Sequence, residues 1–195
     1  MNKIKRTILL VENGQIVGTK AVTPEQLLEM QSPNLDSETK RKALFGIKLK
    51  QIREENGISQ SQLAETIRKK TKKKCTNLAV SSYENGRRYP TLDGLTAICE
   101  IFGVSSDYLL SLSDKEELKA GKRQTFTDRI NAKMAIKGLS SAELAFLVDM
   151  HSDGDIKREP EWGTAMMNGT QDTKVGVLPV LADVFDTTVD ELIGF

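Results

Sequence analysis

The residues best suited to chemistry in this sequence form a run of cations. Six of the eight residues from Arg68 to Cys75 are Lys or Arg. Clustered ammonium and guanidinium groups bind phosphate oxygens, and such contacts supply the salt-dependent part of nucleic-acid affinity. A charge run can equally be an ordinary solvated surface. Phosphate contact is therefore a hypothesis that the elements around this run must support.

The other reactive side chains give little support to catalysis. The single histidine, His151, stands in an acidic stretch, where a solvated loop explains it more simply than a metal site. Cys75 and Cys99 are too few for a structural zinc site, and we interpret both as reduced thiols. We find no phosphate-binding loop and no nucleophile beside a base. We therefore expect no enzyme, no cofactor and no metal.

Composition and charge point to a cytosolic protein with two unlike halves. The 195 residues are 38% hydrophobic and 28% charged, as in soluble globular domains. No apolar run approaches the roughly 18 residues of a membrane span, and the apolar residues 8–11 are too few for a secretory signal. Residues 45–110 carry 11 Lys/Arg against 7 Asp/Glu, a balance of +4, whereas residues 126–195 carry 6 against 12, a balance of −6. Only the first half suits a polyanionic partner.

The N-terminal residues 1–36 predict a hairpin and a short helix. Asn13-Gly14 favours a tight turn between strands at Ile4–Glu12 and Gln15–Val22. The sequence Thr23-Pro24-Glu25-Gln26 is typical of a capping box that opens a helix. Because a two-stranded hairpin is barely stable alone, we expect it to pack on this chain or on another.

Residues 37–112 predict five short helices. Apolar residues recur at helical spacing, and Ser, Thr, Asn and Gly stand where helices should begin and end. The charged residues 113–125 are read as a linker. The five helices are expected to begin at Ser37, after Ser59, near Thr76, at Leu92 and near Ser105.

Residues 126–195 repeat the pattern of this helical unit. A shift of 81 aligns the first two helices and a shift of 83 aligns the rest, with the change falling in a loop. We therefore expect a mainly α protein with two copies of one fold. The aligned pairs include Phe45 with Phe126, Gly57 with Gly138, Ser59 with Ser140, Leu63 with Leu144, Leu95 with Leu178, Phe102 with Phe185 and Asp107 with Asp190.

The motifs of the first copy resemble the lambda-repressor-like (Cro/cI, Xre-type) helix-turn-helix family. They are the run Gly57–Ala64, the run Val80–Pro90, and the ending with Phe102-Gly103-Val104-Ser105 and Asp107–Leu110. The resemblance implies that the helix of Thr76–Glu84 lies in the DNA major groove. It also implies a buried ion pair between Arg53 and Glu84.

The resemblance further assigns individual DNA contacts. Phosphates would be bound by the start of the second helix and by the residues after the third, and base edges by the exposed face of the third helix. The basic run would lie beside that helix, although the family usually has a much shorter connection there. The expected DNA-binding residues are Gln60, Lys72, Lys73, Lys74, Thr76, Asn77, Leu78, Ser81, Ser82, Asn85, Arg87 and Arg88.

The second copy has lost most of these groups, so we expect only the first copy to bind DNA. Its counterparts are Ser141 for Gln60, Pro160 for Asn77, Thr170-Gln171 for Arg87-Arg88, and Met134 and Met167 for the ion pair. We expect a transcriptional regulator of double-stranded DNA, a repressor that binds as a homodimer. The alternative is an antitoxin or inhibitor that holds a protein partner through residues 126–195 or the hairpin and regulates its own gene. Trp162 and Met166-Met167 could anchor such a partner or pack in a core.

Overall fold

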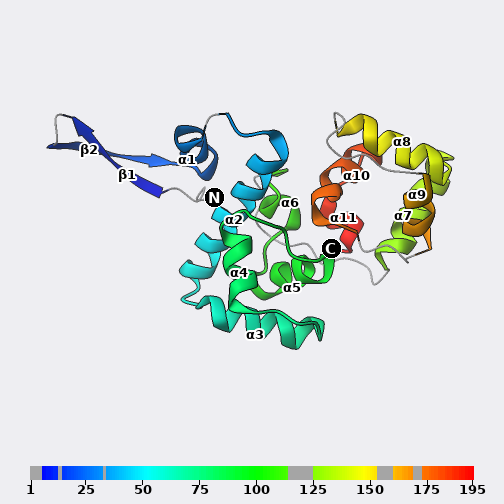
Figure 1. The fold of residues 1–195 in the computed structure, drawn as a ribbon, viewed down its shortest axis with the longest axis horizontal. Coiled ribbons are helices and arrows are strands. Elements are labelled where there is room, and N and C mark those ends of the chain that lie inside the picture. The colour runs from blue at the N-terminus through cyan, green and yellow to red at the C-terminus, as the bar shows by residue number, and fades with distance from the viewer. Residues whose placement is uncertain (1–5, 13–14, 33, 114–124, 153–159, 169–172) are drawn as a thin grey trace.

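The computed structural model describes residues 6–12, 15–32, 34–113, 125–152, 160–168 and 173–195, and these are mainly helical (Figure 1). This confirms the mainly α class expected from the sequence for the described part of the chain. None of the helices in these ranges is long and apolar enough to cross a membrane. The elements are β1 (Arg6–Glu12), β2 (Gln15–Val22), α1 (Pro24–Gln31), α2 (Ser37–Glu55), α3 (Gln60–Thr71), α4 (Asn77–Glu84), α5 (Leu92–Phe102), α6 (Ser106–Leu109), α7 (Phe126–Lys137), α8 (Ser141–His151), α9 (Pro160–Met167), the short 3-10 helix η1 (Val175–Val177), α10 (Leu178–Val184) and α11 (Val189–Ile193).

The hairpin forms where the sequence predicts it. β1 and β2 are antiparallel, with Arg6 opposite Val22 and Glu12 opposite Gln15. The Asn13-Gly14 turn itself lies outside the described residues. In Figure 1 the hairpin extends away from the helices, and Val22 at its base is buried.

Helix α1 begins at the expected capping box and is held against the helices that follow. The Thr23 hydroxyl accepts the Gln26 N–H at 3.3 Å, and Gln26 Oε1 accepts the Thr23 N–H at 3.0 Å. The buried Lys48 of α2 then links two elements. Its Nζ lies 3.3 Å from Glu25 Oε1 of α1 and donates to the carbonyl of Tyr108 in α6 at 3.0 Å. The ammonium group thus helps to fix α1 onto the helices around α2.

Helices α2–α6 begin at side-chain caps. At each start a Ser, Thr or Asp side chain accepts a first-turn N–H, which satisfies a backbone donor that the helix leaves unpaired. The five capping residues are Asp36, Ser59, Thr76, Thr91 and Ser105.

The connection between the second and third of these helices is shorter than the sequence suggested. Helix α3 continues to Thr71, so residues 68–70 form its last turn and only residues 72–76 connect it to α4. Lysine and arginine are good helix formers, and cations are favourable at a helix C-terminus. Lys69 also pairs with Glu65 one turn earlier at 2.9 Å. Lys72, in the left-handed conformation with φ 57°, then ends the helix.

The core of this unit places α2 very close to α4. Phe45 and Leu49 of α2 are fully buried together with apolar side chains of α3, α5 and α6. Gly46 permits the close approach, because a Cβ at this position would lie 2.5 Å from the Glu84 carbonyl oxygen and 2.6 Å from that of Tyr83. The position and tilt of α4 therefore depend on this glycine.

Helices α7–α11 bury a second set of apolar side chains, which joins the first in one connected cluster. Met166 is 1% exposed, so core packing accounts for it and it is not available to a partner. Trp162 is partly exposed. The linker predicted at 113–125 falls mostly on residues 114–124, outside the described ranges. Helix α6 nevertheless contacts α11 directly.

Candidate nucleic-acid interface

Helix α4 has one buried face and one open face. Ala79, Val80 and Glu84 point into the protein, whereas Asn77 is exposed and the Leu78 side chain is 74% exposed. The helix starts at Thr76, whose hydroxyl accepts the Ala79 N–H at 3.2 Å, as the resemblance predicts for the cap. The buried inner face holds this short helix in place, so its outer face is left open to solvent.

The polar groups on the open face are partly engaged within the helix. Asn77 Oδ1 accepts the N–H of Leu78 at 2.9 Å. The Ser82 hydroxyl donates to the Leu78 carbonyl at 2.8 Å, and Asn85 Nδ2 donates to the Ser81 carbonyl at 2.8 Å. These local bonds orient the side chains. A base edge that pairs with Asn77 would have to replace its hydrogen bond to the N–H of Leu78.

A buried ion pair fixes α4 against α2 and α3. Arg53 Nε donates to Glu84 Oε1 at 2.5 Å and Arg53 Nη2 to Oε2 at 3.0 Å. The hydrogen bond to Glu84 raises the pKa of Arg53 above its ordinary value. Arg53 Nη1 also donates to the Ile58 carbonyl at 2.8 Å, which holds the turn before α3. The pair expected from the sequence is thus present as a two-bond contact.

Gln60 is placed differently from a free phosphate ligand. Its Nε2 donates to Glu84 Oε2 at 2.8 Å, so the side-chain amide completes the ion-pair network. Sequence reasoning missed this role, although residues 126–195 lack the counterparts of Gln60, Arg53 and Glu84 together under the expected alignment, which was a signal for it. The residue still lies at the start of α3, where the helix dipole favours an anion.

The cations beside α4 differ in how far they are already paired. Lys73 lies 2.5 Å from Asp93, and Lys70 in the last turn of α3 lies 2.8 Å from Glu100. Lys72 and Lys74 are exposed, and no ion pair joins either of them to another described residue. Lys72 and Lys74 are therefore the members of this run best placed to meet a phosphate.

The turn after α4 supplies two more exposed guanidinium groups. Gly86 has φ 66°, and a Cβ there would meet the Ala43 backbone at 2.8 Å, so the turn is tightly held against α2. Arg87 and Arg88 follow it and are exposed. The Arg88 guanidinium lies 5.3 Å from the centre of the Tyr83 ring, a cation–π contact that orients it.

The structure brings the predicted site residues to one region around α4. Most of them are exposed, and three are partly buried. The exposed residues are Lys72, Lys73, Lys74, Thr76, Asn77, Leu78, Asn85, Arg87 and Arg88, and the partly buried ones are Gln60, Ser81 and Ser82.

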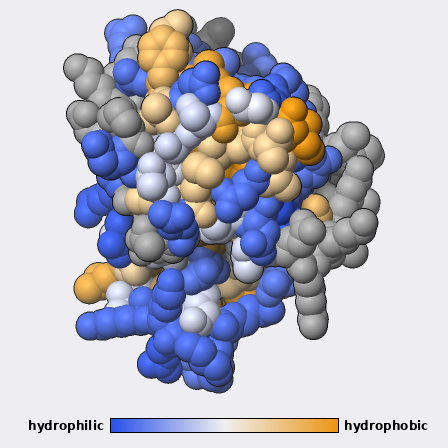
Figure 2. Space-filling view, turned by 90° about the vertical axis from the view of Figure 1, so that its right-hand side faces the viewer, coloured by the Kyte–Doolittle hydropathy of each residue, from blue (hydrophilic) through white to orange (hydrophobic). Residues whose placement is uncertain are grey.

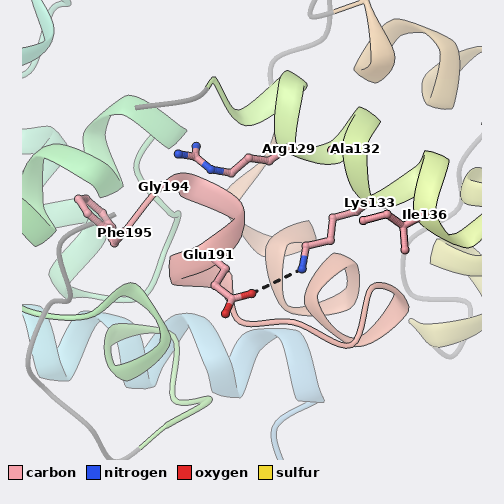
Figure 3. Close-up of a pocket in the computed structure, with 7 residues that line it drawn as sticks. All are labelled: Arg129, Ala132, Lys133, Ile136, Glu191, Gly194 and Phe195. Atoms are coloured by element: carbon pink, nitrogen blue, oxygen red, sulfur yellow. Dashed lines mark hydrogen bonds and ion pairs between the residues drawn. The ribbon is translucent and has the colours of Figure 1, made fainter. Parts of the chain in front are cut away.

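Two other groups of reactive side chains lie in the described part of the chain, the two thiols and the lining of a pocket. Burial raises the pKa of the Cys75 and Cys99 thiols, which disfavours a nucleophilic thiolate. Figure 3 shows a pocket of about 260 Å³ between α7 and α11, where Lys133 Nζ lies 3.5 Å from Glu191 Oε2. Its described lining residues include no serine, cysteine or histidine.

Comparisons with known proteins agree with the position of these helices. Residues 49–109 match the family described as Helix-turn-helix. The HTH-type transcriptional activator BcrR of Enterococcus faecalis is 36% identical over 67 residues, which are 34% of this chain and 30% of that protein. The SPbeta prophage-derived uncharacterized HTH-type transcriptional regulator YonR of Bacillus subtilis (strain 168) is 34% identical over 89 residues, 40% of this chain and 77% of that protein. The match thus spans less than a third of the activator's length. No solved structure matches the chain.

Proposed function

The chain belongs to the helix-turn-helix family, and we propose that it is a transcriptional regulator that binds specific double-stranded DNA through α4. The observation that carries this proposal is the open face of α4, where Leu78 is 74% exposed beside Asn77. A single exposed leucine is ordinary. Here it stands on a helix whose opposite face is held by a buried ion pair, with exposed cations before its start and after its end. Leucine can contact a thymine methyl and asparagine can pair with adenine.

The proposed contacts divide into two kinds. Asn77, Leu78 and Ser82 would read base edges, because they share the open face of α4. Lys72, Lys74 and the two arginines after α4 would bind phosphates, which adds affinity and register but no sequence information. Lys73 would contribute less, since Asp93 already neutralises it.

We also propose that α7–α11 are a degenerate copy of α2–α6. The five helices occur in the same order, and the starts of α8 and α9 are offset from those of α3 and α4 by the two shifts found in the sequence. Gly57 and Gly138 both have φ 65°. Where Arg53 is paired in the first copy, the buried Met134 stands in the second. With its balance of −6 and without the DNA-contact residues, the second copy would not bind DNA.

The resemblance predicts three further properties, and each is kept as a proposal. They are repression by occlusion of a promoter, action in the cytosol, where the DNA of a bacterial cell lies, and homodimerisation on a two-fold site, which requires chains whose α6 is not covered by their own α11. One relative is named an activator, so a reporter gene with and without the protein must decide the direction of regulation.

The test is selection of bound sequences from a random DNA pool, followed by one substitution. Asn77→Ala should weaken binding to the selected site by about 1 to 3 kcal/mol and relax preference at one or two base pairs, while leaving random DNA unaffected. Asn34→Ala, which alters an exposed asparagine before α2, is the matched control and should change neither. Failure to enrich any sequence, or an equal loss on both DNAs, would refute sequence reading by α4.

A second candidate function, protein binding by the second copy, is favoured by exposed apolar side chains. Ile136, Phe146 and Met150 on α7 and α8 are 82%, 62% and 62% exposed. The face turned to the viewer in Figure 2 mixes apolar with polar surface. At the positions of Phe146 and Met150 the first copy has the charged pair Glu65 and Lys69. An antitoxin-like or inhibitor role predicts a partner that co-purifies with the wild-type chain and is lost with Phe146→Ser, while DNA binding is unchanged.

A further inference from the structure

The contact between α6 and α11 is built from two carboxylates that cap each other's helices. Asp107 Oδ1 accepts the N–H of Val189 at 2.9 Å, and its Oδ2 accepts the N–H of Asp190 at 2.8 Å. In return, Asp190 Oδ1 accepts the N–H of Ser106 at 2.7 Å, and its Oδ2 accepts the Ser105 hydroxyl at 2.6 Å. The Ser106 hydroxyl also donates to Asp190.

This contact is reciprocal in the manner of a two-fold axis. Asp107 and Asp190 are equivalent under the shift of 83, and so are Ser106 and Val189. Each acid therefore accepts the N–H of the same position in the other helix. Residue i touching j while j touches i is the rule of a symmetric dimer interface. In Figure 1 the equivalent helices α5 and α10, and likewise α3 and α8, lie on opposite sides of this contact.

The face of α6 is fully used within the chain. Ser106 and Val189 are both 0% exposed, and Asp107 is 6% exposed. A second contact supports the first, since a Cβ on Gly176 of η1 would lie 3.4 Å from the ring of Tyr89. A second chain cannot reach this face while α11 covers it.

We infer that the α6 face is a self-association surface, and that the chain's own α11 occupies it in place of a second subunit. The partner that fits this face is α6 of another copy. There each Asp107 would accept the N–H groups of Ser106 and Asp107 of the other chain, and serine hydroxyls would be present on both sides. Replacing α11 by α6 of another copy keeps an equivalent for each hydrogen bond of the α6–α11 contact. The contact between two chains would therefore compete with the internal one.

The inference has a consequence for DNA that rests on the proposed function. The closed chain has the layout of a two-subunit regulator, but among its described helices only α4 carries the proposed base-reading residues. It therefore recognises a single half-site, one chain for each DNA. Freed α6 faces would join two chains and place two α4 helices about a true two-fold axis, for which an inverted repeat is the matching site.

The first experiment measures mass in solution without DNA. The full-length wild type should remain one chain across the concentration range. Asp190→Ala should form dimers at lower concentration than the wild type, because it weakens the internal contact and leaves α6 intact. The double variant Asp107→Ala/Asp190→Ala should not, since it also removes the acceptor that joins two α6 helices. A wild-type dimer, or an Asp190→Ala variant that associates no more than the double variant, overturns the inference.

The second experiment repeats the random-pool selection with the same proteins. The wild type should enrich an asymmetric sequence in a one-to-one complex, and Asp190→Ala should enrich an inverted repeat that binds two chains. An inverted repeat selected by the wild type overturns the internal-dimer inference and leaves DNA reading by α4 standing. No enrichment with any variant would instead reject the proposed function, while the mass measurement still decides the inference.

Discussion

Removing the charges of Arg53 and Glu84 separately and together gives a quantitative test of how α4 is held. The side chains of Arg53 and Glu84 are 10% and 2% exposed. With Arg53→Met alone, Glu84 would remain buried with only the Gln60 amide as a partner, and we expect a loss of about 3 to 5 kcal/mol. Glu84→Met should cost less within this range, because Arg53 keeps the Ile58 carbonyl. The double variant should lie within about 1 to 2 kcal/mol of the wild type, since the proposed second copy has methionine at both aligned positions.

The assay is urea unfolding of the four proteins, followed by circular dichroism and combined as a double-mutant cycle. The matched control is the exposed pair Glu65–Lys69, with side chains 52% and 71% exposed, whose cycle with methionine should couple by only about 0.5 kcal/mol. A double Met variant as unstable as the sum of the two single variants would refute the argument. It would mean that the two charges contribute independently rather than as one buried pair.

Three further predictions concern phosphate contact, close packing and pH. Lys72→Gln/Lys74→Gln should make the log-affinity versus log-salt slope shallower by about two units, whereas the exposed Lys174→Gln should leave it unchanged; equal slopes would exclude phosphate contact. Gly46→Ala should destabilise the fold by about 1 to 3 kcal/mol, because its Cβ would meet two carbonyls at the end of α4, and unfolding curves that overlay the wild type would contradict this. Burial raises the pKa of Asp107 although the N–H groups of Val189 and Asp190 act in the opposite direction, so the folded state holds this proton more tightly, and the stability that depends on it should fall as pH rises above about 4. Asp107→Asn should remove this part of the pH dependence of the urea midpoint, and an unchanged profile would refute it.

The helix starts could be predicted because they depend on local chemistry. Ser59 with Gln62 and Thr23 with Gln26 form the capping boxes that their spacing indicates. The end of α3 could not be read in the same way. A run of lysines can continue a helix or leave it, and the outcome depends on whether a residue such as Lys72 accepts a positive φ. That choice depends on where α4 is fixed by tertiary contacts, which no local pattern records.

The candidate site shows a similar division. The resemblance placed Asn77 and Leu78 on the outer face of α4. This was possible because the residues that a short helix buries also determine which residues it exposes. The pairing of Lys73 with Asp93 was not foreseeable, since the two residues meet only after α3 and α5 are packed. Counting the lysines and arginines of a sequence therefore overestimates how many of them can bind a phosphate once the chain has folded. Because Lys73 is paired, Lys72 and Lys74 are the strongest candidates for phosphate binding in the connection between α3 and α4.

The contact between α6 and α11 was hidden from the sequence for a different reason. Asp107 and Asp190 each stand in the first turn of a short helix, where an acidic residue is expected for its own helix dipole. That local explanation is sufficient, so neither residue alone suggested a partner. Their equivalence in the repeat was the available signal. Two halves related by a two-fold axis bring equivalent residues together at the axis, and the second copy retains Asp190 although it has lost Gln60, Arg53 and Glu84. Retention of one polar residue amid the loss of a polar network is what a contact between copies, rather than a contact with DNA, would produce.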